Sequence, residues 1–251
     1  MSTFLIALGL SLLGGLGGLF VASGVLLIKD STLAKAVPWL VSYAVGALLG
    51  VAMLGILPNT LEQLSPSQVF TTLLLGILLF FVLEKLVLWR HCHTHDCEVH
   101  DGSVAPVVVG DAFHNFVDGA VIAAAVVTSV PLGISTALAV AAHEIPQEIG
   151  DFVVLIHSGF AKARALAWNA VSGAASVVGG VAAYFAFSAV EAWITDILAF
   201  AAASMIYVAV ADLIPGLQRR TALRESLTQV IFIALGVGSI WLVHAVLFPE
   251  G

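Results

Sequence analysis

Long apolar runs follow one another along the chain, separated by short polar connections. A membrane-spanning helix needs about 20 mostly apolar residues to cross about 30 Å of hydrocarbon. By this measure the sequence predicts eight spans, at residues 4–28, 38–58, 69–89, 104–129, 131–157, 165–190, 193–214 and 226–248. We therefore expect an all-α membrane protein in which residues 1–251 form one transmembrane domain.

The composition also favours a membrane protein. Hydrophobic residues make up 60% of the chain and charged residues 10%, with a mean hydropathy of +1.08. A soluble domain has about 45–50% apolar and about 25% charged residues. The formal net charge of −7 says little about partners, because the charges lie in loops and a few special positions. The two cysteines, Cys92 and Cys97, share one polar loop, so we expect no disulfide framework.

The basic residues all border alternate connections between the predicted spans. The nine are Lys29, Lys35, Lys85, Arg90, Lys162, Arg164, Arg219, Arg220 and Arg224. The connections on the other side (59–68, around 130 and 189–195) have none. Cytoplasmic connections carry an excess of Lys and Arg, so we expect both termini outside the cytoplasm. We expect a multi-pass protein of a bacterial inner membrane.

Two of the predicted spans end alike. The second ends in Gly55-Ile56-Leu57-Pro58 and the seventh in Asp212-Leu213-Ile214-Pro215, and in the predicted topology these spans run in opposite directions. Inverted repeats around a mid-membrane site are a common transporter plan. The similar endings of the second and seventh spans predict inverted repeats of spans 1–3 and 6–8 around spans 4 and 5.

Spans 4 and 5 carry polar residues at helical spacing. One stripe of the fourth span holds Asp111, His114, Asn115 and Asp118. One broad face of the fifth holds His143, Glu144, Gln147, Glu148 and Asp151. An ionised group near the bilayer centre costs about 2.5–3.5 kcal/mol unless it is paired or hydrated. Neither span has a Lys or Arg, so protons, an ion or water must compensate the carboxylates.

The residue types indicate a transition-metal ion. Imidazole nitrogen together with carboxylate and amide oxygen suits zinc, iron or manganese. Pro146 leaves the carbonyl of Ala142 without an intrahelical donor and tends to bend the helix. Membrane helices tolerate such breaks where the backbone faces protein or a wet cavity. The sequence thus predicts a metal site between spans 4 and 5; the alternative is a purely structural polar cluster.

These polar residues stand in two recognisable motifs. HNFVDG, residues 114–119, resembles the HNxxDG signature of the ZIP family (Zrt/Irt-like metal transporters), and HEIPQEIGD, residues 143–151, resembles that family's HExPHExGD signature. The resemblance implies a binuclear metal centre formed by His114, Asn115, Asp118, His143, Glu144 and Gln147. Gln147 stands where the most similar subfamily usually has histidine, and an amide there should weaken zinc binding. Pathway or supporting roles are expected of Asp111, Glu148, Asp151 and Asp212.

The resemblance also implies a function. A ZIP transporter would carry a divalent metal into the cytosol, with Zn²⁺ expected first and Fe²⁺, Mn²⁺ or Cd²⁺ as alternatives. The ion would be the bound substrate, and no catalytic cofactor or enzyme activity is expected. One helix bundle would move against another, often within a homodimer. The remaining expected partner is the lipid bilayer, with no nucleic acid.

A predicted cytoplasmic loop, residues 90–103, offers further candidate ligands: His91, Cys92, His93, His95, Cys97 and His100. Their spacing fits no fixed zinc-finger pattern, so the hypothesis is a flexible metal-capturing or sensing loop rather than an inert one. Two rival functions follow. His143-Glu144 begins like the HExxH of a zinc protease, although Gln147 and Pro146 argue against it. The loop alone would suit a non-transporting metal sensor.

Overall fold

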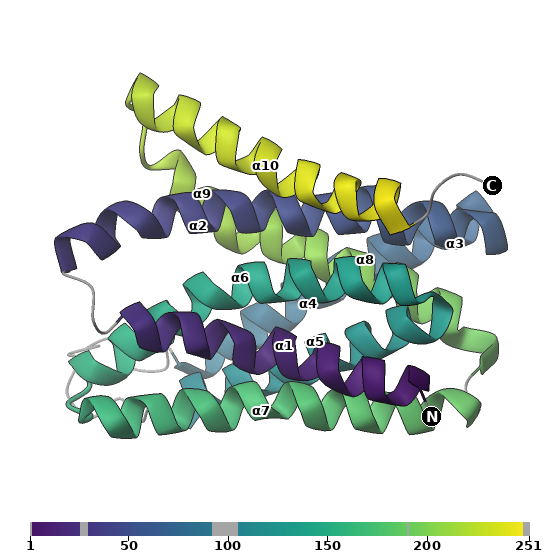
Figure 1. Cartoon of the computed structure of the whole chain (residues 1–251), viewed down its shortest axis with the longest axis horizontal. Helices are drawn as coiled ribbons and strands as arrows, with labels where there is room; N and C mark the ends of the chain where they lie inside the picture. Colours follow the sequence, from purple (N-terminus) through teal and green to yellow (C-terminus); the bar gives the residue numbers. More distant parts are fainter. Residues whose placement is uncertain (1, 26–29, 92–104, 190, 248–251) are drawn as a thin grey trace.

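The computed structural model describes residues 2–25, 30–91, 105–189 and 191–247, which are helical apart from short connections and include no strand. Six stretches are single helices: α1 (Ser2–Val25), α4 (Pro66–His91), α5 (Ala105–Thr128), α6 (Val130–His157), α7 (Lys162–Ala186) and α10 (Leu223–Leu247) (Figure 1). Two are composite: α2 (Asp30–Gly50), η1 (Val51–Ile56) and α3 (Leu57–Gln63); then α8 (Ile194–Tyr207), η4 (Val208–Leu213) and α9 (Ile214–Gln218). The short 3₁₀ turns η2 (Phe187–Ala189) and η3 (Glu191–Trp193) precede α8.

The prediction of an all-helical fold is confirmed for the described residues, and their apolar helices are consistent with a membrane protein. Among the described residues, six helical stretches are long and apolar enough to cross a membrane. The other two long helices, α5 and α6, fall outside this group, and they are the two that carry the polar stripes predicted above. Their crossing of the membrane, and hence a total of eight spans, stays a prediction.

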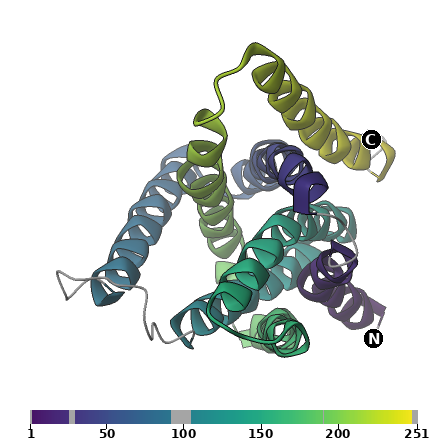
Figure 2. The same cartoon turned by 90° about the vertical axis from the view of Figure 1, so that its left-hand side faces the viewer.

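The helices form two groups, which separate when the molecule is viewed from one end (Figure 2). In the first group α1, α5, α6 and α7 pack on one another. In the second, α10 packs on α2 and α4 packs on α8. The groups meet mainly where α2 and α10 contact α6 and where α5 contacts α8.

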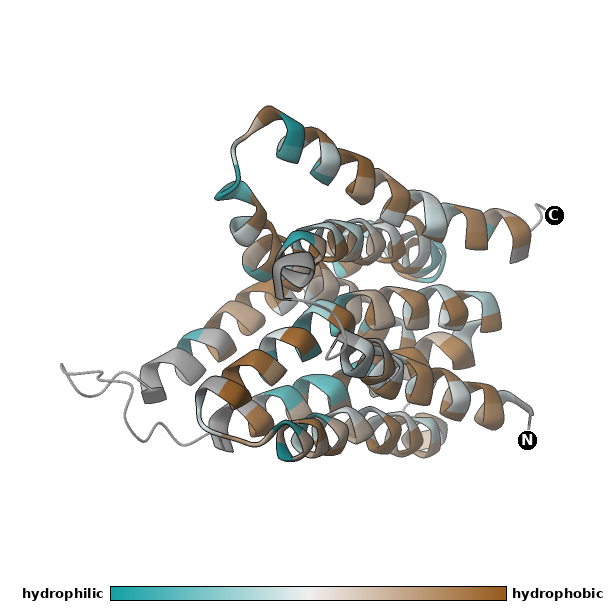
Figure 3. Cartoon of the chain, turned by 60° about the vertical axis from the view of Figure 1, so that its left-hand side comes forward, coloured by the Kyte–Doolittle hydropathy of each residue, from teal (hydrophilic) through white to brown (hydrophobic). Residues whose placement is uncertain are grey.

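The outermost helices present apolar surface. In the most apolar windows of α4 and α10, Pro66–Leu83 and Leu223–Val246, 11% of the residues are buried. Along α10 the hydrophilic residues lie near its beginning and hydrophobic residues follow (Figure 3). Contiguous exposed apolar surface of this extent is typical of contact with a membrane or another protein.

Both composite stretches contain a π-helix that ends two residues before a proline. The backbone N–H of Leu57 donates to the carbonyl of Ala52, and that of Ile214 donates to Ala209, five residues back in each case. Pro58 and Pro215 then follow at the start of α3 and α9. A proline ring clashes with the carbonyl four residues before it, and in both stretches that carbonyl lies inside the wider π turn. The π segments therefore let each proline stay within a continuous helical stretch.

Glycines allow α5 and α7 to lie unusually close. A Cβ added to Gly119 would collide with the backbone carbonyl of Ser176, and one added to Gly179 would collide with that of Phe116. Small residues permit such close backbone approach in membrane helix bundles. Helix α5, which carries the candidate metal ligands of the fourth predicted span, is thus held against α7 by close backbone contact.

The described basic side chains lie at one end of the molecule. The beginnings of α2, α7 and α10 all lie at the left-hand end of Figure 1, and they carry Lys35, Lys162 and Arg224. The opposite end carries the acids Glu62, which is exposed, and Asp196, which is half-buried and accepts a hydrogen bond of 2.9 Å from Gln68. The helices therefore alternate in direction as the sequence predicted.

Candidate metal centre

Facing turns of α5 and α6 bring four ligand-type side chains together. His114 and Asp118 lie one helical turn apart on α5, and His143 and Glu144 are consecutive on α6. Asp118, His143 and Glu144 are buried, while the His114 side chain is 24% exposed. One ligand atom from each residue lies within 4.8 Å of the others. We call these four residues the core cluster.

The distances within the core cluster centre on the Nε2 atoms of the two imidazoles. His143 Nε2 lies 3.0 Å from Asp118 Oδ2 and 3.4 Å from Glu144 Oε1. His114 Nε2 lies 3.6 Å from each of the same two oxygens. The two Nε2 atoms are 3.1 Å apart.

This spacing matches a tetrahedral metal site. Zinc binds imidazole nitrogen and carboxylate oxygen at about 2.0–2.2 Å, so neighbouring ligands of a tetrahedral ion lie about 3.4 Å apart. Five of the six separations between the ligand atoms run from 3.0 to 3.6 Å, and all four atoms lie within 4.8 Å of one another. A transition-metal ion at the centre of the core cluster would need only small side-chain adjustments.

The backbone of α6 offers an acceptor to the second ring nitrogen of His143. His143 Nδ1 lies 3.1 Å from the carbonyl oxygen of Ala139. A carbonyl only accepts hydrogen bonds, so a proton on Nδ1 would donate to it, and with a metal ion bound Nε2 would then be the ligand atom. Metal-binding histidines are commonly oriented in this way through their second nitrogen.

Several oxygens at the site have no hydrogen-bond partner among the described residues. These buried atoms are Asp118 Oδ2, both carboxylate oxygens of Glu144 and of Glu148, and Asn115 Oδ1. Burying an unpaired charge is strongly unfavourable, and neither α5 nor α6 has a lysine or arginine. A divalent cation would compensate the carboxylates of the core cluster.

The two amides expected as ligands are held by Asp111. Gln147 Nε2 donates to Asp111 Oδ1 at 2.9 Å, and Asn115 Nδ2 donates to the same oxygen at 3.2 Å. Asp111 therefore orients both amide groups, with each nitrogen toward Asp111 and each oxygen outside this hydrogen bond. The structure brings Asp111, Asn115 and Gln147 together beside the core cluster, but as a hydrogen-bonded group rather than as members of the four-residue set.

The remaining candidates are placed as follows. Glu148 is buried one turn beyond Glu144, and Asp151 is half-buried a turn further along α6. Asp212 lies in η4 with an exposed side chain, outside the core cluster. The loop ligands Cys92, His93, His95, Cys97 and His100 lie outside the described residues, as does the side chain of His91.

Two residues outside α5 and α6 support the site, and of these Asn169 was not anticipated from the sequence. Asn169 on α7 is buried and donates a hydrogen bond of 3.0 Å to the backbone carbonyl of Glu148. Gly18 on α1 leaves room for Glu144, whose Cβ would lie 3.2 Å from an added glycine Cβ. Asn169 is the only amide in α7, surrounded by apolar and small residues, and this was the available signal.

Comparison with known proteins gives one family. The family model described as ZIP Zinc transporter matches residues 90–244. "Zinc transporter zipt-7.1" of Caenorhabditis briggsae is 27% identical over 277 residues, covering 82% of this chain and 71% of the relative. "Zinc transporter YKE4" of Saccharomyces cerevisiae is 28% identical over 253 residues, covering 83% and 71%. "Zinc transporter foi" of Drosophila melanogaster is 35% identical over 140 residues, covering 55% of this chain.

The relatives differ from this chain in length and source. The chain spans 19% of the length of the fly protein and 71% of the nematode and yeast proteins. These three relatives are eukaryotic and give no support to the expectation of a bacterial inner membrane.

Proposed function

The chain belongs to the ZIP zinc transporter family, and on that premise we propose that it transports divalent transition-metal ions across a membrane. The observation that carries the proposal is the core cluster of His114, Asp118, His143 and Glu144, spaced for a tetrahedral ion. Zn²⁺ is the first candidate substrate, because two imidazoles and two carboxylates suit it and the relatives named above are zinc transporters. Fe²⁺, Mn²⁺ and Cd²⁺ are the alternatives.

We propose two unequal ion positions rather than two equal ones. The core cluster supplies four ligands to the first ion. A second ion would depend on the oxygens of Asn115 and Gln147, whose amide nitrogens are held by Asp111. Neutral amide oxygens bind zinc more weakly than imidazole does. The HExPHExGD subfamily is therefore the proposed relative, with Gln147 as the departure that weakens the second position.

The two helix groups suggest how the ion moves. The core cluster lies wholly within the group α1, α5, α6 and α7, which is fixed internally by glycine contacts. The group α2, α4, α8 and α10 meets it mainly where α2 and α10 contact α6 and where α8 contacts α5. We propose that the metal-binding group shifts against the other group, carrying the ion toward the cytosol.

The packing also supports inverted repeats. If spans 1–3 correspond to spans 6–8, then α1 matches α7, α2 matches α8 and α4 matches α10. The contact of α2 with α10 then has its counterpart in the contact of α8 with α4, and both contacts occur. The contact of α1 with α6 likewise corresponds to that of α7 with α5. The π-helices η1 and η4 occupy matching places before Pro58 and Pro215. In this arrangement both chain termini lie outside the cytoplasm and eight helical stretches cross the membrane.

The rival functions are less well supported. In a zinc protease with an HExxH motif, residue 147 would be the second histidine ligand, yet Gln147 donates a hydrogen bond to Asp111 instead. The sensor hypothesis depends on the loop at residues 90–103, of which 92–103 lie outside the described residues. Transport accounts for both the core cluster and the family.

The test is metal uptake into proteoliposomes containing the purified chain. Radiolabelled zinc, iron and manganese are supplied separately to wild type and to the His143→Ala and Glu144→Ala variants. We expect each variant to lose at least about tenfold in zinc uptake, since removing one ligand of a buried ion costs at least about 1.4 kcal/mol of binding. The exposed Glu62 provides the matched control, and Glu62→Ala should transport normally. Wild type without metal-dependent flux would refute the proposal.

A further inference from the structure

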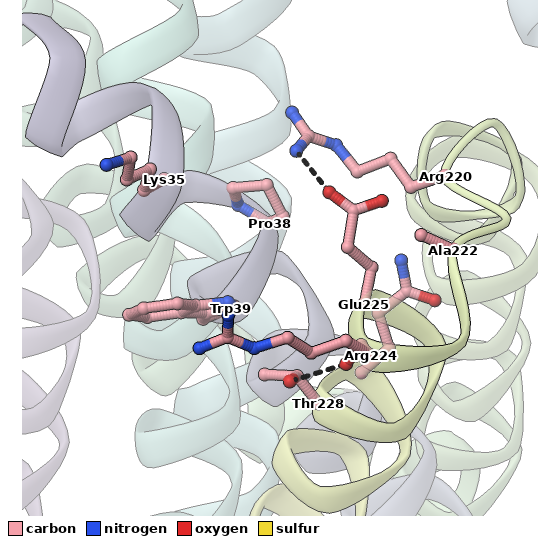
Figure 4. Close-up of a pocket in the computed structure, with 9 residues that line it drawn as sticks. Lys35, Pro38, Trp39, Arg220, Ala222, Arg224, Glu225 and Thr228 are labelled. Atoms are coloured by element: carbon pink, nitrogen blue, oxygen red, sulfur yellow. Dashed lines mark hydrogen bonds and ion pairs between the residues drawn. The ribbon is translucent and has the colours of Figure 1, made fainter.

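A cationic pocket lies at the basic end of the molecule, away from the core cluster. It is formed where the first turns of α2 face the beginning of α10 and the connection that precedes it (Figure 4). The pocket has a volume of about 500 Å³ and is lined by Lys35, Pro38, Trp39, Arg220, Ala222, Arg224, Glu225, Thr228 and Gln229. Its two walls are separated by more than 180 residues of sequence.

Positive charge exceeds negative charge in this pocket. Three cations, Lys35, Arg220 and Arg224, face one acid, Glu225. Glu225 forms an ion pair with Arg220, in which Oε1 and Nη1 are 3.6 Å apart. Among the described residues no carboxylate lies within ion-pair distance of Lys35 or Arg224. The pocket thus keeps two positive charges for an anion.

One wall of the pocket is aromatic and leads onto apolar surface. The Trp39 ring is 45% exposed and stacks on Phe232 of α10, with ring centroids 5.9 Å apart and planes at 14°. Arg224 extends from α10 toward Trp39 (Figure 4). Further along α10 the side chains of Leu227 and Ile231 are 56% and 57% exposed. Tryptophan with neighbouring basic residues is typical of the headgroup level of a bilayer.

Tight packing beyond the pocket fixes α2 against α10. A Cβ at Gly46 would collide with the carbonyl of Ile233, and one at Gly236 would collide with that of Tyr43. The Tyr43 hydroxyl also donates to Ser239 Oγ at 2.9 Å. Gln229 Nε2 donates to the carbonyl of Leu217 at 3.1 Å and so ties α10 to α9. An anion would enter a preformed site.

We propose that this pocket binds the phosphate of an anionic phospholipid, with Lys35 and Arg224 as its charged contacts. Basic pockets between helices at a membrane surface bind such headgroups, and arginine pairs well with phosphate oxygens. A free phosphate ion would satisfy the same cations. The lipid is favoured because the pocket continues onto the exposed apolar face of α10, along which acyl chains would run.

The site lies in the helix group that does not carry the metal. Lys35 belongs to α2 and Arg224 to α10, and the core cluster lies on α5 and α6. A lipid bound there would brace α2 against α10 at the membrane surface. The inference does not depend on which metal the chain transports, because its test measures lipid binding directly.

The test is native mass spectrometry of the full chain released from detergent micelles. Phosphatidylglycerol and phosphatidylcholine of equal chain length are titrated separately. We expect one phosphatidylglycerol to be retained in preference to phosphatidylcholine. The double variant Lys35→Gln/Arg224→Gln should weaken this binding about 10–30-fold, the effect of two surface cations at about 1 kcal/mol each.

Matched variants distinguish a built site from diffuse charge. Lys162→Gln/Arg164→Gln removes two exposed cations at the same end of the molecule but outside the pocket, and should change the affinity less than threefold. Lys35→Arg/Arg224→Lys keeps both charges and should retain the lipid. Equal losses in all three variants, or no preference for phosphatidylglycerol, would overturn the proposal. Glycerol 3-phosphate binding as tightly as the lipid would show a free-phosphate site instead.

Discussion

Asp111 organises two amides with one carboxylate oxygen. Asn115 and Gln147 come from different helices, and both donate to Asp111 Oδ1. Each amide is thereby oriented with its nitrogen toward Asp111, leaving its oxygen as the end available to an ion. A histidine at position 147 would offer nitrogen lone pairs that the glutamine lacks. The identity of this residue therefore controls the proposed second ion position.

Replacing Gln147 with histidine tests this role. We expect Gln147→His to raise the affinity for the weaker zinc ion by at least about tenfold, or about 1.4 kcal/mol, because imidazole is the better zinc ligand. Isothermal titration of the purified protein with zinc would then resolve a second tight ion.

The matched control places a new histidine elsewhere. Gln218 is exposed in α9, outside the core cluster, so Gln218→His should leave both zinc affinities unchanged. Identical zinc titrations of Gln147→His and wild type would contradict the proposed role of position 147.

At this scale the sequence was informative about residues that share a helix. The spacing of His114 and Asp118 placed them on one face of a helix, and the polar run from His143 to Asp151 marked its partner. Helical spacing did not predict that Asp111 would bind both amides, because the contact with Gln147 depends on how α5 and α6 are set against each other. Metal binding itself stays a prediction.

The close contact of α5 with α7 is the element on which the position of the site depends. Gly119 follows Asp118 directly, and no side chain larger than hydrogen fits between it and the backbone of Ser176. Any added atom must push the two helices apart. The displacement would reach the core cluster through Asp118.

Gly119→Ala should therefore destabilise the protein by about 1–3 kcal/mol, the usual cost of overpacking. It should also weaken zinc binding. Thermal unfolding in detergent and zinc titration are the two measurements. Gly110→Ala is the control on the same helix, because an added Cβ there meets nothing within 4 Å. A Gly119→Ala protein as stable as the Gly110→Ala protein would refute the close contact.

The π-helices were not predicted, although their cause is visible in the sequence. Pro58 and Pro215 interrupt long apolar runs, and a proline inside a helix must be accommodated by a kink, a break or a wider turn. Hydrophobic periodicity does not distinguish these outcomes. The paired endings were read only as a sign of repeats, whereas the structure shows the same local solution in η1 and η4.

For the whole molecule, the one-sided basic residues make a prediction about topology. Ser158 follows α6 at the basic end, and Ser65 lies between α3 and α4 at the opposite end, and both are exposed. In a background of Cys92→Ser and Cys97→Ser, each serine is replaced by cysteine. A membrane-impermeant maleimide should label Ser65→Cys in intact cells and Ser158→Cys only after permeabilisation.

The reverse labelling pattern would invert the proposed topology. Labelling of both positions in intact cells would mean that an odd number of helices was misassigned between them. The readout is independent of transport activity, so a failure here would leave the metal-binding proposal intact.

Sequence patterns predicted the order and direction of the helices but not their neighbours. Each long helix is apolar enough to face several others, so periodicity leaves the packing undetermined. The pocket between Lys35 and Arg224 illustrates this limit, because its walls come from opposite ends of the chain. Only the packing of α2 on α10 makes those two cations neighbours.

The matching helix contacts of the two proposed repeats have a consequence for the direction of metal transport. If α1–α6 and α7–α5 are equivalent pairs, the ion meets equivalent helices whichever side of the membrane it approaches. By microscopic reversibility, a route built in this way serves import and export with the same steps. Net flow would then follow the electrochemical gradient of the metal, and any rectification must come from features that the two halves do not share.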